Sequence, residues 1–98
     1  MKPTLKNEEK AIGDIIFQFI DPNEHQVFIF GSRATGKARK FSDYDIGIIG
    51  KKPIAWEILS LIDEAFEESD LPFKVDIVDF SLVSDKFRKT ALSKIKEL

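Results

Sequence analysis

The sequence predicts one α/β domain in which helices cover a small β-sheet, in the chain order helix, strand, short helix, strand, helix, strand, helix. Segments with apolar residues at helical spacing alternate with short runs rich in Val, Ile and Phe, and this alternation is typical of helices packed on a sheet. A chain of 98 residues is long enough for one modest hydrophobic core, so residues 1–98 are expected to form a single domain.

The first half of the chain predicts a helix, a strand and a short helical turn. Residues 7–20 place isoleucine and phenylalanine at the spacing of one buried helix face, and Pro22 ends this helix because proline cannot continue the hydrogen-bond ladder. Residues 27–30 are a wholly apolar run of strand formers, which predicts a strand covered on both faces. The polar segment after Gly31 has room for a helical turn beginning at Ser32, a residue suited to an N-cap.

The second half predicts two more strands and two more helices. Residues 43–49 are expected to form a strand closed by Gly50, and residues 73–80 a third strand. A helix with Pro53 in its first turn is expected to run to about residue 68, and a last helix to span about residues 82–96. The pattern allows parallel and antiparallel pairing of the three strands equally.

The composition excludes several classes of protein. The 15 basic and 17 acidic residues give a net charge of −2, without the positive excess of a general nucleic-acid binder. The chain has no cysteine, which excludes disulfides, zinc–thiolate sites and thiol nucleophiles. Residues 1–10 lack the apolar centre of a secretion signal, and no apolar run approaches the ~20 residues of a membrane span. We therefore expect a cytoplasmic protein that does not bind membranes.

Gly31 and Ser32, at the end of the first strand, are candidates for holding a phosphate. Glycine lets the backbone approach a ligand closely, and the following amides and the serine hydroxyl are hydrogen-bond donors. The alternative is an ordinary turn. Arg33 and Lys37 begin a basic loop that runs to residue 40, directly before an acidic pair, and such a loop suits a polyphosphate bound together with its metal. The alternative for these cations is a solvated loop.

Asp43 and Asp45 are the first candidates for a metal site. Residues i and i+2 of a strand point to the same face, which places the two carboxylates about 6–7 Å apart along the backbone. Such a pair is mutually repulsive unless a hard divalent cation such as Mg²⁺ neutralises it. The alternative is that Asp43 caps a turn and Asp45 is solvated.

Asp76 and Asp79 lie in the apolar third strand, where a lone carboxylate is costly to bury. Their positions have opposite parity, so the two side chains face opposite sides of the sheet and only one can join Asp43 and Asp45. We favour Asp76, which lies deeper in the strand. Asp79 is nearer the end, where it either supports the site or caps the following helix.

Other conspicuous residues are expected to be structural. Tyr44 alternates away from the two acids and should pack in the core. Trp56 is expected at a core edge or an interface, and His25 on the surface. The lysines near the end of the chain are expected to form a solvated helix face; these are Lys89, Lys94 and Lys96.

Together these residues carry a resemblance to a known family. Gly31-Ser32, ten further residues and Asp43-Tyr44-Asp45 give the spacing G-S-x10-D-x-D, which resembles the signature of polymerase-β-type nucleotidyltransferases. The whole chain is similar to the small members called minimal nucleotidyltransferases (MNT), and Asp76 falls where that family carries its third carboxylate. Gly47 departs mildly from the family, whose strand often has a bulkier residue there. The resemblance implies a small mixed sheet covered by helices.

The resemblance also implies a mechanism and site residues. Asp43 and Asp45 would bind two Mg²⁺ ions that bridge the oxygens of a nucleoside triphosphate, and Asp76 would complete the ion that activates an acceptor hydroxyl. Gly31 and Ser32 would hold the β- and γ-phosphates, and Arg33 and Lys37 would neutralise remaining charge. ATP is the expected triphosphate, and whether Mg²⁺ or Mn²⁺ serves in the cell is open.

A partner is implied as well. Larger nucleotidyltransferases hold their acceptor with an additional domain, so the acceptor here is expected to come from a second protein or a second copy of this chain. Minimal nucleotidyltransferases commonly pair with small helical HEPN proteins, where the MNT protein is the antitoxin of a HEPN ribonuclease and adenylylates a tyrosine of it. Transfer of one AMP or of several is equally open.

Two other functions compete with this one. A non-catalytic module could neutralise a partner by contact alone, although a decayed site need not keep three carboxylates in register. A small-molecule nucleotidyltransferase, such as one that modifies aminoglycosides, is less favoured because no acidic second domain is present to hold a cationic drug.

Overall fold

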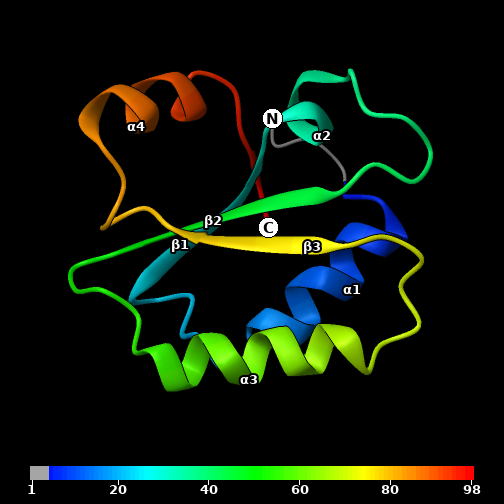
Figure 1. Cartoon of the computed structure of the whole chain (residues 1–98), viewed down its shortest axis with the longest axis horizontal. Coiled ribbons are helices and arrows are strands. Elements are labelled where there is room, and N and C mark those ends of the chain that lie inside the picture. The colour runs from blue at the N-terminus through cyan, green and yellow to red at the C-terminus, as the bar shows by residue number, and fades with distance from the viewer. Residues whose placement is uncertain (1–4) are drawn as a thin grey trace.

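The computed structural model describes residues 5–98, and its helices and strands alternate as predicted (Figure 1). The elements are α1 (Asn7–Ile16), β1 (His25–Phe30), α2 (Ser32–Thr35), β2 (Tyr44–Gly50), α3 (Trp56–Glu67), β3 (Val75–Asp79), α4 (Asp85–Leu92) and β4 (Lys96–Glu97). The longest helix of the described residues, α3, has 12 residues, and no helix among them is long and apolar enough to cross a membrane.

The four strands form one mixed sheet in the order β3-β2-β1-β4. Strand β1 pairs antiparallel with β2 and with β4, whereas β2 pairs parallel with β3. The mixed sheet is therefore confirmed. The free edge of β3 and the edge formed by the short β4 bound the sheet on its two sides.

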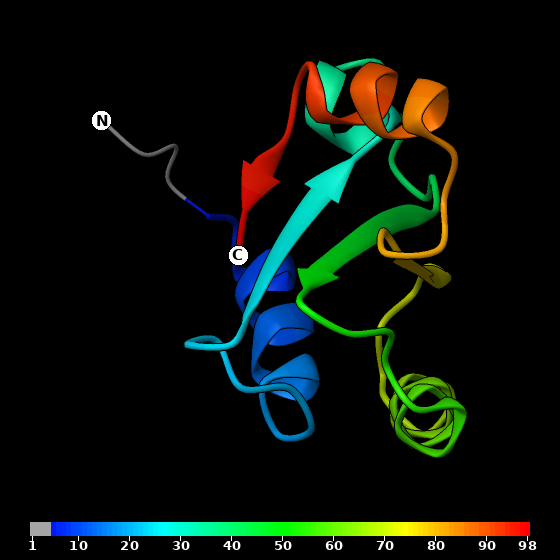
Figure 2. The ribbon, with the colours of Figure 1, turned by 90° about the vertical axis from the view of Figure 1, so that its left-hand side faces the viewer.

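Helices cover both faces of the sheet, α1 and α3 on one face and α2 and α4 on the other (Figures 1 and 2). On the first face the isoleucines of α1 and α3 pack on side chains such as Tyr44, Ile46 and Ile48. On the second face the core is an aromatic cluster of Phe28, Phe30 and Phe80. Because neighbouring residues of a strand alternate between faces, each position of β2 and β3 is assigned to one of the two sides.

Gly47 makes room for the aromatic cluster. A Cβ atom at this position would lie 2.4 Å from the ring of Phe28 and 2.7 Å from that of Phe80. The two rings pack edge to face with centroids 5.0 Å apart, an arrangement that the ring quadrupoles favour. The glycine that departs from the family pattern is thus explained by the bulk of the phenylalanines opposite it.

The largest differences from the predicted element boundaries lie in the three long helices. The first helix ends at Ile16, not residue 20, and turns complete the segment. Pro53 lies before α3, whose N-cap is Ala55. The last helix ends at Leu92, and Lys96–Glu97 become a fourth strand opposite Phe28 and Ile29. The helical spacing of the last apolar residues did not predict this strand. A longer helix would leave backbone groups of β1 without hydrogen-bond partners at that edge, and pairing with residues 96–97 supplies those partners.

Candidate active site

The strand registers align the predicted site residues in a row across the sheet. Phe30 of β1 lies opposite Asp45 of β2, and Asp45 lies opposite Asp76 of β3. Gly31 follows Phe30 directly, so it stands at the β1 end of this row. With strands about 4.8 Å apart, the row spans roughly 10 Å. Asp43 lies just before β2, two residues from Asp45.

Asp43, Asp45 and Asp76, hereafter the acidic cluster, share one electrostatic environment. Tyr44 and Ile46 face α1 and α3, so Asp45 faces the opposite side, and Asp76 does the same because Val75 and Ile77 pack with the first core. Burial raises the pKa of Asp45, and the carboxylates of Asp76 and Asp43 raise it further. The site therefore disfavours its own negative charge and favours a bound cation.

Gly31 is required at its position for two reasons. Its φ of 74° lies in the left-handed region, which side chains disfavour. A Cβ atom there would lie only 2.5 Å from Oδ2 of Asp45. The amides of Ala34 and Thr35 donate to the Gly31 carbonyl, which folds α2 back over this end of the strand. The backbone thus runs directly against the Asp45 carboxylate, and no side chain at position 31 would fit between them.

The helical turn begins at Ser32 as predicted, but its N-cap is Gly31 and not Ser32. No hydrogen bond within residues 5–98 uses the Ser32 hydroxyl. The first amides of a helix have no acceptor within it. The hydroxyl and these amides are therefore the donors that the strand end offers to a ligand.

The acidic cluster fits a magnesium ion in part. Carboxylate oxygens are the ligands Mg²⁺ prefers, but within the described chain no three His, Asp or Glu side chains converge into a complete metal site. Nζ of Lys74 lies 3.5 Å from Oδ1 of Asp76, so a protein cation neutralises this acid. Mg²⁺ commonly takes only one or two carboxylates and completes its shell with water and substrate phosphates. The donor set is consistent with ions that arrive with a nucleotide.

Arg33 is not brought to the acidic cluster. Its Nη2 donates to the carbonyls of Ser42 and Lys40 at 2.7 and 3.2 Å, and its Nε also donates to Ser42 at 3.2 Å. Its guanidinium lies 4.3 Å from the ring centroid of Tyr44, and its side chain is only 7% exposed. Arg33 therefore fixes the backbone immediately before Asp43.

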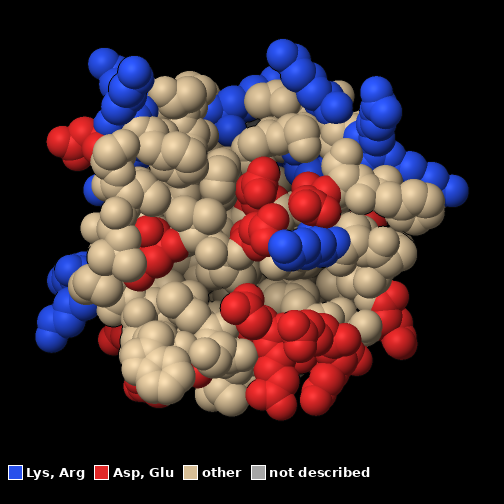
Figure 3. Space-filling model, viewed as in Figure 1, with Lys and Arg blue, Asp and Glu red and all other residues tan. Residues whose placement is uncertain are grey.

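Lys37 lies in the exposed loop between α2 and β2, and its amide donates to the Ser32 carbonyl. The Arg39 amide donates to Oγ of Ser42, which shapes the end of the same loop. Figure 3 shows basic side chains along this edge of the molecule, next to acidic side chains gathered over the centre of the face. Of the two predicted cations, Arg33 and Lys37, Lys37 is the one that is accessible to a ligand.

Asp79 does not join the acidic cluster. Its side chain is buried and accepts hydrogen bonds from the amide of Ile54 at 2.7 Å and from the amide and hydroxyl of Ser81 at 2.9 and 2.6 Å. The predicted opposite orientation of Asp76 and Asp79 is confirmed. Asp79 does not cap α4, whose N-cap is Ser84. It instead anchors the segment between β2 and α3.

Among the residues expected to be structural, Tyr44 is buried as predicted, and its hydroxyl donates to Glu8 at 2.8 Å. Lys96 was wrongly placed on a solvated helix face, since its Nζ binds the buried Glu9 at 2.6 Å. Lys74 was not among the residues predicted from the sequence. The i, i+2 spacing that groups Asp43 with Asp45 also groups Lys74 with Asp76 and could have found it.

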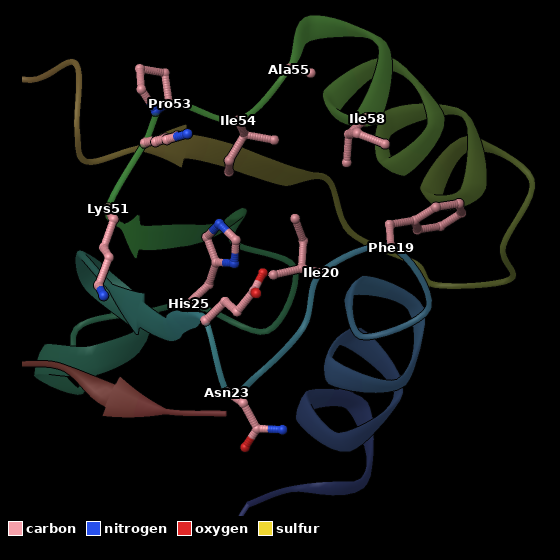
Figure 4. Close-up of a pocket in the computed structure, with 11 residues that line it drawn as sticks. Phe19, Ile20, Asn23, His25, Lys51, Pro53, Ile54, Ala55 and Ile58 are labelled. Atoms are coloured by element: carbon pink, nitrogen blue, oxygen red, sulfur yellow. The ribbon is translucent and has the colours of Figure 1, made fainter.

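Two of the cavities among the described residues have similar volumes and lie far apart. One, of about 550 Å³, lies at the other end of the sheet, where Lys51, Ile20 and Ile54 surround the imidazole of His25 (Figure 4). His25 is half-buried and not the surface residue predicted, because its ring packs over Gly50. This cavity is a strand length from the acids, roughly 17 Å at ~3.3 Å per residue. A second cavity of about 550 Å³ has Asp76 in its wall.

Comparisons with known proteins agree with this geometry. Residues 14–98 match the family described as Polymerase beta, Nucleotidyltransferase. The chain is 44% identical over 85 residues to the probable protein adenylyltransferase MntA of Haemophilus influenzae, a match that covers 87% of this chain and 74% of that protein.

Two solved structures have a similar fold. A toxin–antitoxin solved with AMP-PNP is 23% identical, with a TM-score of 0.64 over 94% of this chain and 72% of that chain. A complex of a tri-AMPylated Shewanella oneidensis HEPN toxin with MNT antitoxin is 18% identical, with a TM-score of 0.58 over 90% of this chain and 69% of that chain. At these identities the likeness shows the fold alone.

Proposed function

Because the chain belongs to the polymerase-β-type nucleotidyltransferase family, as one of its minimal members, we propose that it transfers AMP from ATP to a tyrosine hydroxyl of a HEPN-type toxin. The observation that carries this proposal is the row of Gly31, Asp45 and Asp76 across three strands. It combines a phosphate-binding backbone with acids that favour a cation. ATP is a cytoplasmic metabolite, so the proposal also places the protein in the cytoplasm.

The triphosphate is proposed to lie at the β1 end of the row. The first amides of α2 and the Ser32 hydroxyl would donate to the β- and γ-phosphates, and Gly31 would let these groups approach closely. Lys37 would neutralise charge from the adjoining loop. Arg33 would act indirectly, by holding the residues that precede Asp43.

Asp43, Asp45 and Asp76 are proposed to hold two divalent ions, taken here as Mg²⁺. When bound, the ions would neutralise charge on the phosphates and on the attacking and leaving oxygens. The acceptor oxygen attacks the α-phosphorus, the bond to the bridging oxygen breaks, and pyrophosphate leaves with the electron pair. Asp76, at the end of the row away from the phosphates, would receive the acceptor proton and pass it to water.

The choice of a toxin as acceptor rests on the relatives. The Haemophilus protein is named a probable protein adenylyltransferase, and a fold neighbour is an MNT antitoxin solved with an AMPylated HEPN toxin. By this analogy the modification would inactivate the toxin, which makes the chain an antitoxin. Association of two copies of this chain is compatible with the same activity.

The test is transfer of label from α-labelled ATP with Mg²⁺, with and without the protein encoded beside this one. We expect label on that neighbour, and a loss of more than about 100-fold in Asp43→Asn, because even outer-shell changes at metal sites cost 10–100-fold. A variant that still neutralises the toxin without transferring label would show that the protein acts by contact alone.

A further inference from the structure

The cavity around His25 lies at the end of the sheet away from the acidic cluster, and the reaction proposed above uses none of the residues in its wall. Its volume is about 550 Å³. Pockets of a few hundred Å³ are the size that encloses small organic molecules, and they usually combine apolar walls with a few polar groups. The chemistry of the wall therefore indicates which kind of molecule this cavity fits.

The wall of this cavity has an apolar side and a polar side. Figure 4 shows Phe19 and Ile58 on one side, and Lys51 with the imidazole of His25 on the other. Phe19 and Ile58 are only half-buried, so the fold leaves part of their apolar surface in contact with water. A molecule with one apolar end and one polar end would cover that surface and still reach the polar side.

The polar side carries an excess of positive charge. Lys51 and Lys52 both contribute to the wall, both are exposed, and no ion pair within residues 5–98 involves either of them. Glu24 is the one acidic residue in the described wall, so two lysines face a single carboxylate. The excess positive charge favours a ligand with an anionic group.

Two further groups in the wall favour the same kind of ligand. Nδ1 of His25 is buried and has no hydrogen-bond partner among the described residues, so the imidazole has hydrogen-bonding capacity that the protein does not use. Helix α3, of 12 residues, begins at the wall with Ala55 as its N-cap, and no side chain accepts a hydrogen bond from its first amides. These amides carry the partial positive charge of a helix N-terminus, which stabilises an anion.

We propose that this cavity binds a small organic anion, in which a carboxylate or phosphate is attached to a ring or a short hydrocarbon chain. The anionic group lies with Lys51, Lys52 and the start of α3, and it forms a hydrogen bond with His25. The apolar part packs on Phe19 and Ile58. The site is separate from the acidic cluster, so this proposal and the proposed function do not depend on each other.

The test is a titration followed by the NMR signals of the His25 imidazole, which are unambiguous because the chain has 1 histidine. The ligands are naphthoate, its uncharged amide, and acetate, which has the charge without the ring. The variant in the cavity wall is Lys51→Gln with Lys52→Gln. The matched control on α4 is Lys86→Gln with Lys89→Gln, which removes the same charge. All four lysines are exposed, so both variants should fold.

We expect naphthoate to shift the imidazole signals to saturation with a Kd of about 1 mM or tighter, the affinity that ordinary ligand efficiency gives a compound of this size. The amide and acetate should each bind at least about fivefold more weakly, because each lacks one half of the interaction. The variant in the cavity wall should weaken naphthoate binding about tenfold, and the control should stay within about twofold of the wild type.

Three results would each overturn the proposal: equal binding of naphthoate and its amide, equal weakening in the two variants, or no movement of the imidazole signals with any ligand. The proposed function would stand after each of them, since it is tested by label transfer from ATP.

Discussion

The Asp45 carboxylate lies in an unfavourable electrostatic environment. It is partly buried, it lies opposite Asp76, and Gly31 approaches it so closely that no side chain fits between. Burial and the nearby carboxylates of Asp76 and Asp43 oppose the ionised form of the Asp45 carboxyl. A bound cation favours the ionised form, because its attraction to the three carboxylates offsets their mutual repulsion.

The first prediction is that Asp45→Asn abolishes transfer yet stabilises the metal-free protein at neutral pH. A carboxyl whose pKa is raised by folding contributes its full stability at low pH and loses it as the pH rises through that pKa. The variant should therefore melt a few degrees higher in EDTA at pH 7, where ~1 kcal/mol corresponds to about 4–8 °C, and the gain should shrink towards pH 4. Asp14→Asn, on the exposed side of α1, is the control. A lower melting temperature at pH 7 would contradict this account.

Lys74 competes with any ion that Asp76 binds, since its ammonium lies 3.5 Å from the carboxylate. Lys74→Met should tighten Mn²⁺ binding by about two- to fivefold, the size expected for an exposed ion pair, as measured by electron paramagnetic resonance. Lys86→Met, an exposed lysine of α4, should leave the affinity unchanged. Weaker binding in the Lys74 variant would mean that the lysine supports the metal site.

For single residues, the sequence predicted the acids of the site but not the residues that position or neutralise them. Alternation along a strand is a local rule, and it placed Asp43 with Asp45 and separated Asp76 from Asp79. The fate of Arg33 depends on Tyr44 and on the carbonyl of Ser42, nine residues away along the chain, and no local pattern records that contact. Arg33 was therefore expected to contact the phosphates, whereas in the structure it packs beneath the loop.

Among the elements, the segment between α2 and β2 depends on Arg33, whose guanidinium binds two of its carbonyls. Arg33→Lys keeps the charge but cannot bind both carbonyls as a planar fork. We expect kcat to fall by about 10- to 100-fold, because a displacement of about 1 Å can cost this much, while the protein stays folded. Arg39→Lys, in the exposed part of the loop, is the control, and equal rates in both variants would contradict a positioning role.

Strand β4 is tied to α1 by a buried ion pair. Lys96 donates to Glu9, which is only 1% exposed and also accepts from the amide of Lys6. Burial raises the pKa of Glu9, but the bonds from Lys96 and Lys6 outweigh it and hold this pKa below its usual value. The stability that the pair contributes is thus present at neutral pH and is lost as the pH falls through the lowered pKa.

Lys96→Met should lower the free energy of unfolding by about 3 kcal/mol, because it leaves a buried carboxylate without its cation. Denaturant unfolding at pH 7 measures this, with the exposed Lys94→Met as control. The deficit should narrow in acid, where Glu9 is protonated. A change as small as that of the control would show that β4 does not depend on the pair.

Across the whole molecule, the fold class and the order of the first seven elements were predictable because helical and strand periodicities differ clearly along this chain. The fourth strand was not, since two residues at an edge carry no periodicity and pair only because β1 is already in place. The site residues were predictable where they follow a regular spacing along the sequence. The direction of their row across the sheet, from Gly31 to Asp76, came only from the strand registers.

In the proposed reaction the acids act on the α-phosphorus of ATP, and AMP passes to a protein. Parallel incubations with α-labelled and γ-labelled ATP, Mg²⁺ and the neighbouring protein test it most directly. We predict α-label on the neighbour and γ-label only in pyrophosphate, with both signals absent in Asp45→Asn. Label from the γ-position on protein would contradict the account, because it would mean that the terminal phosphoryl group is the one transferred.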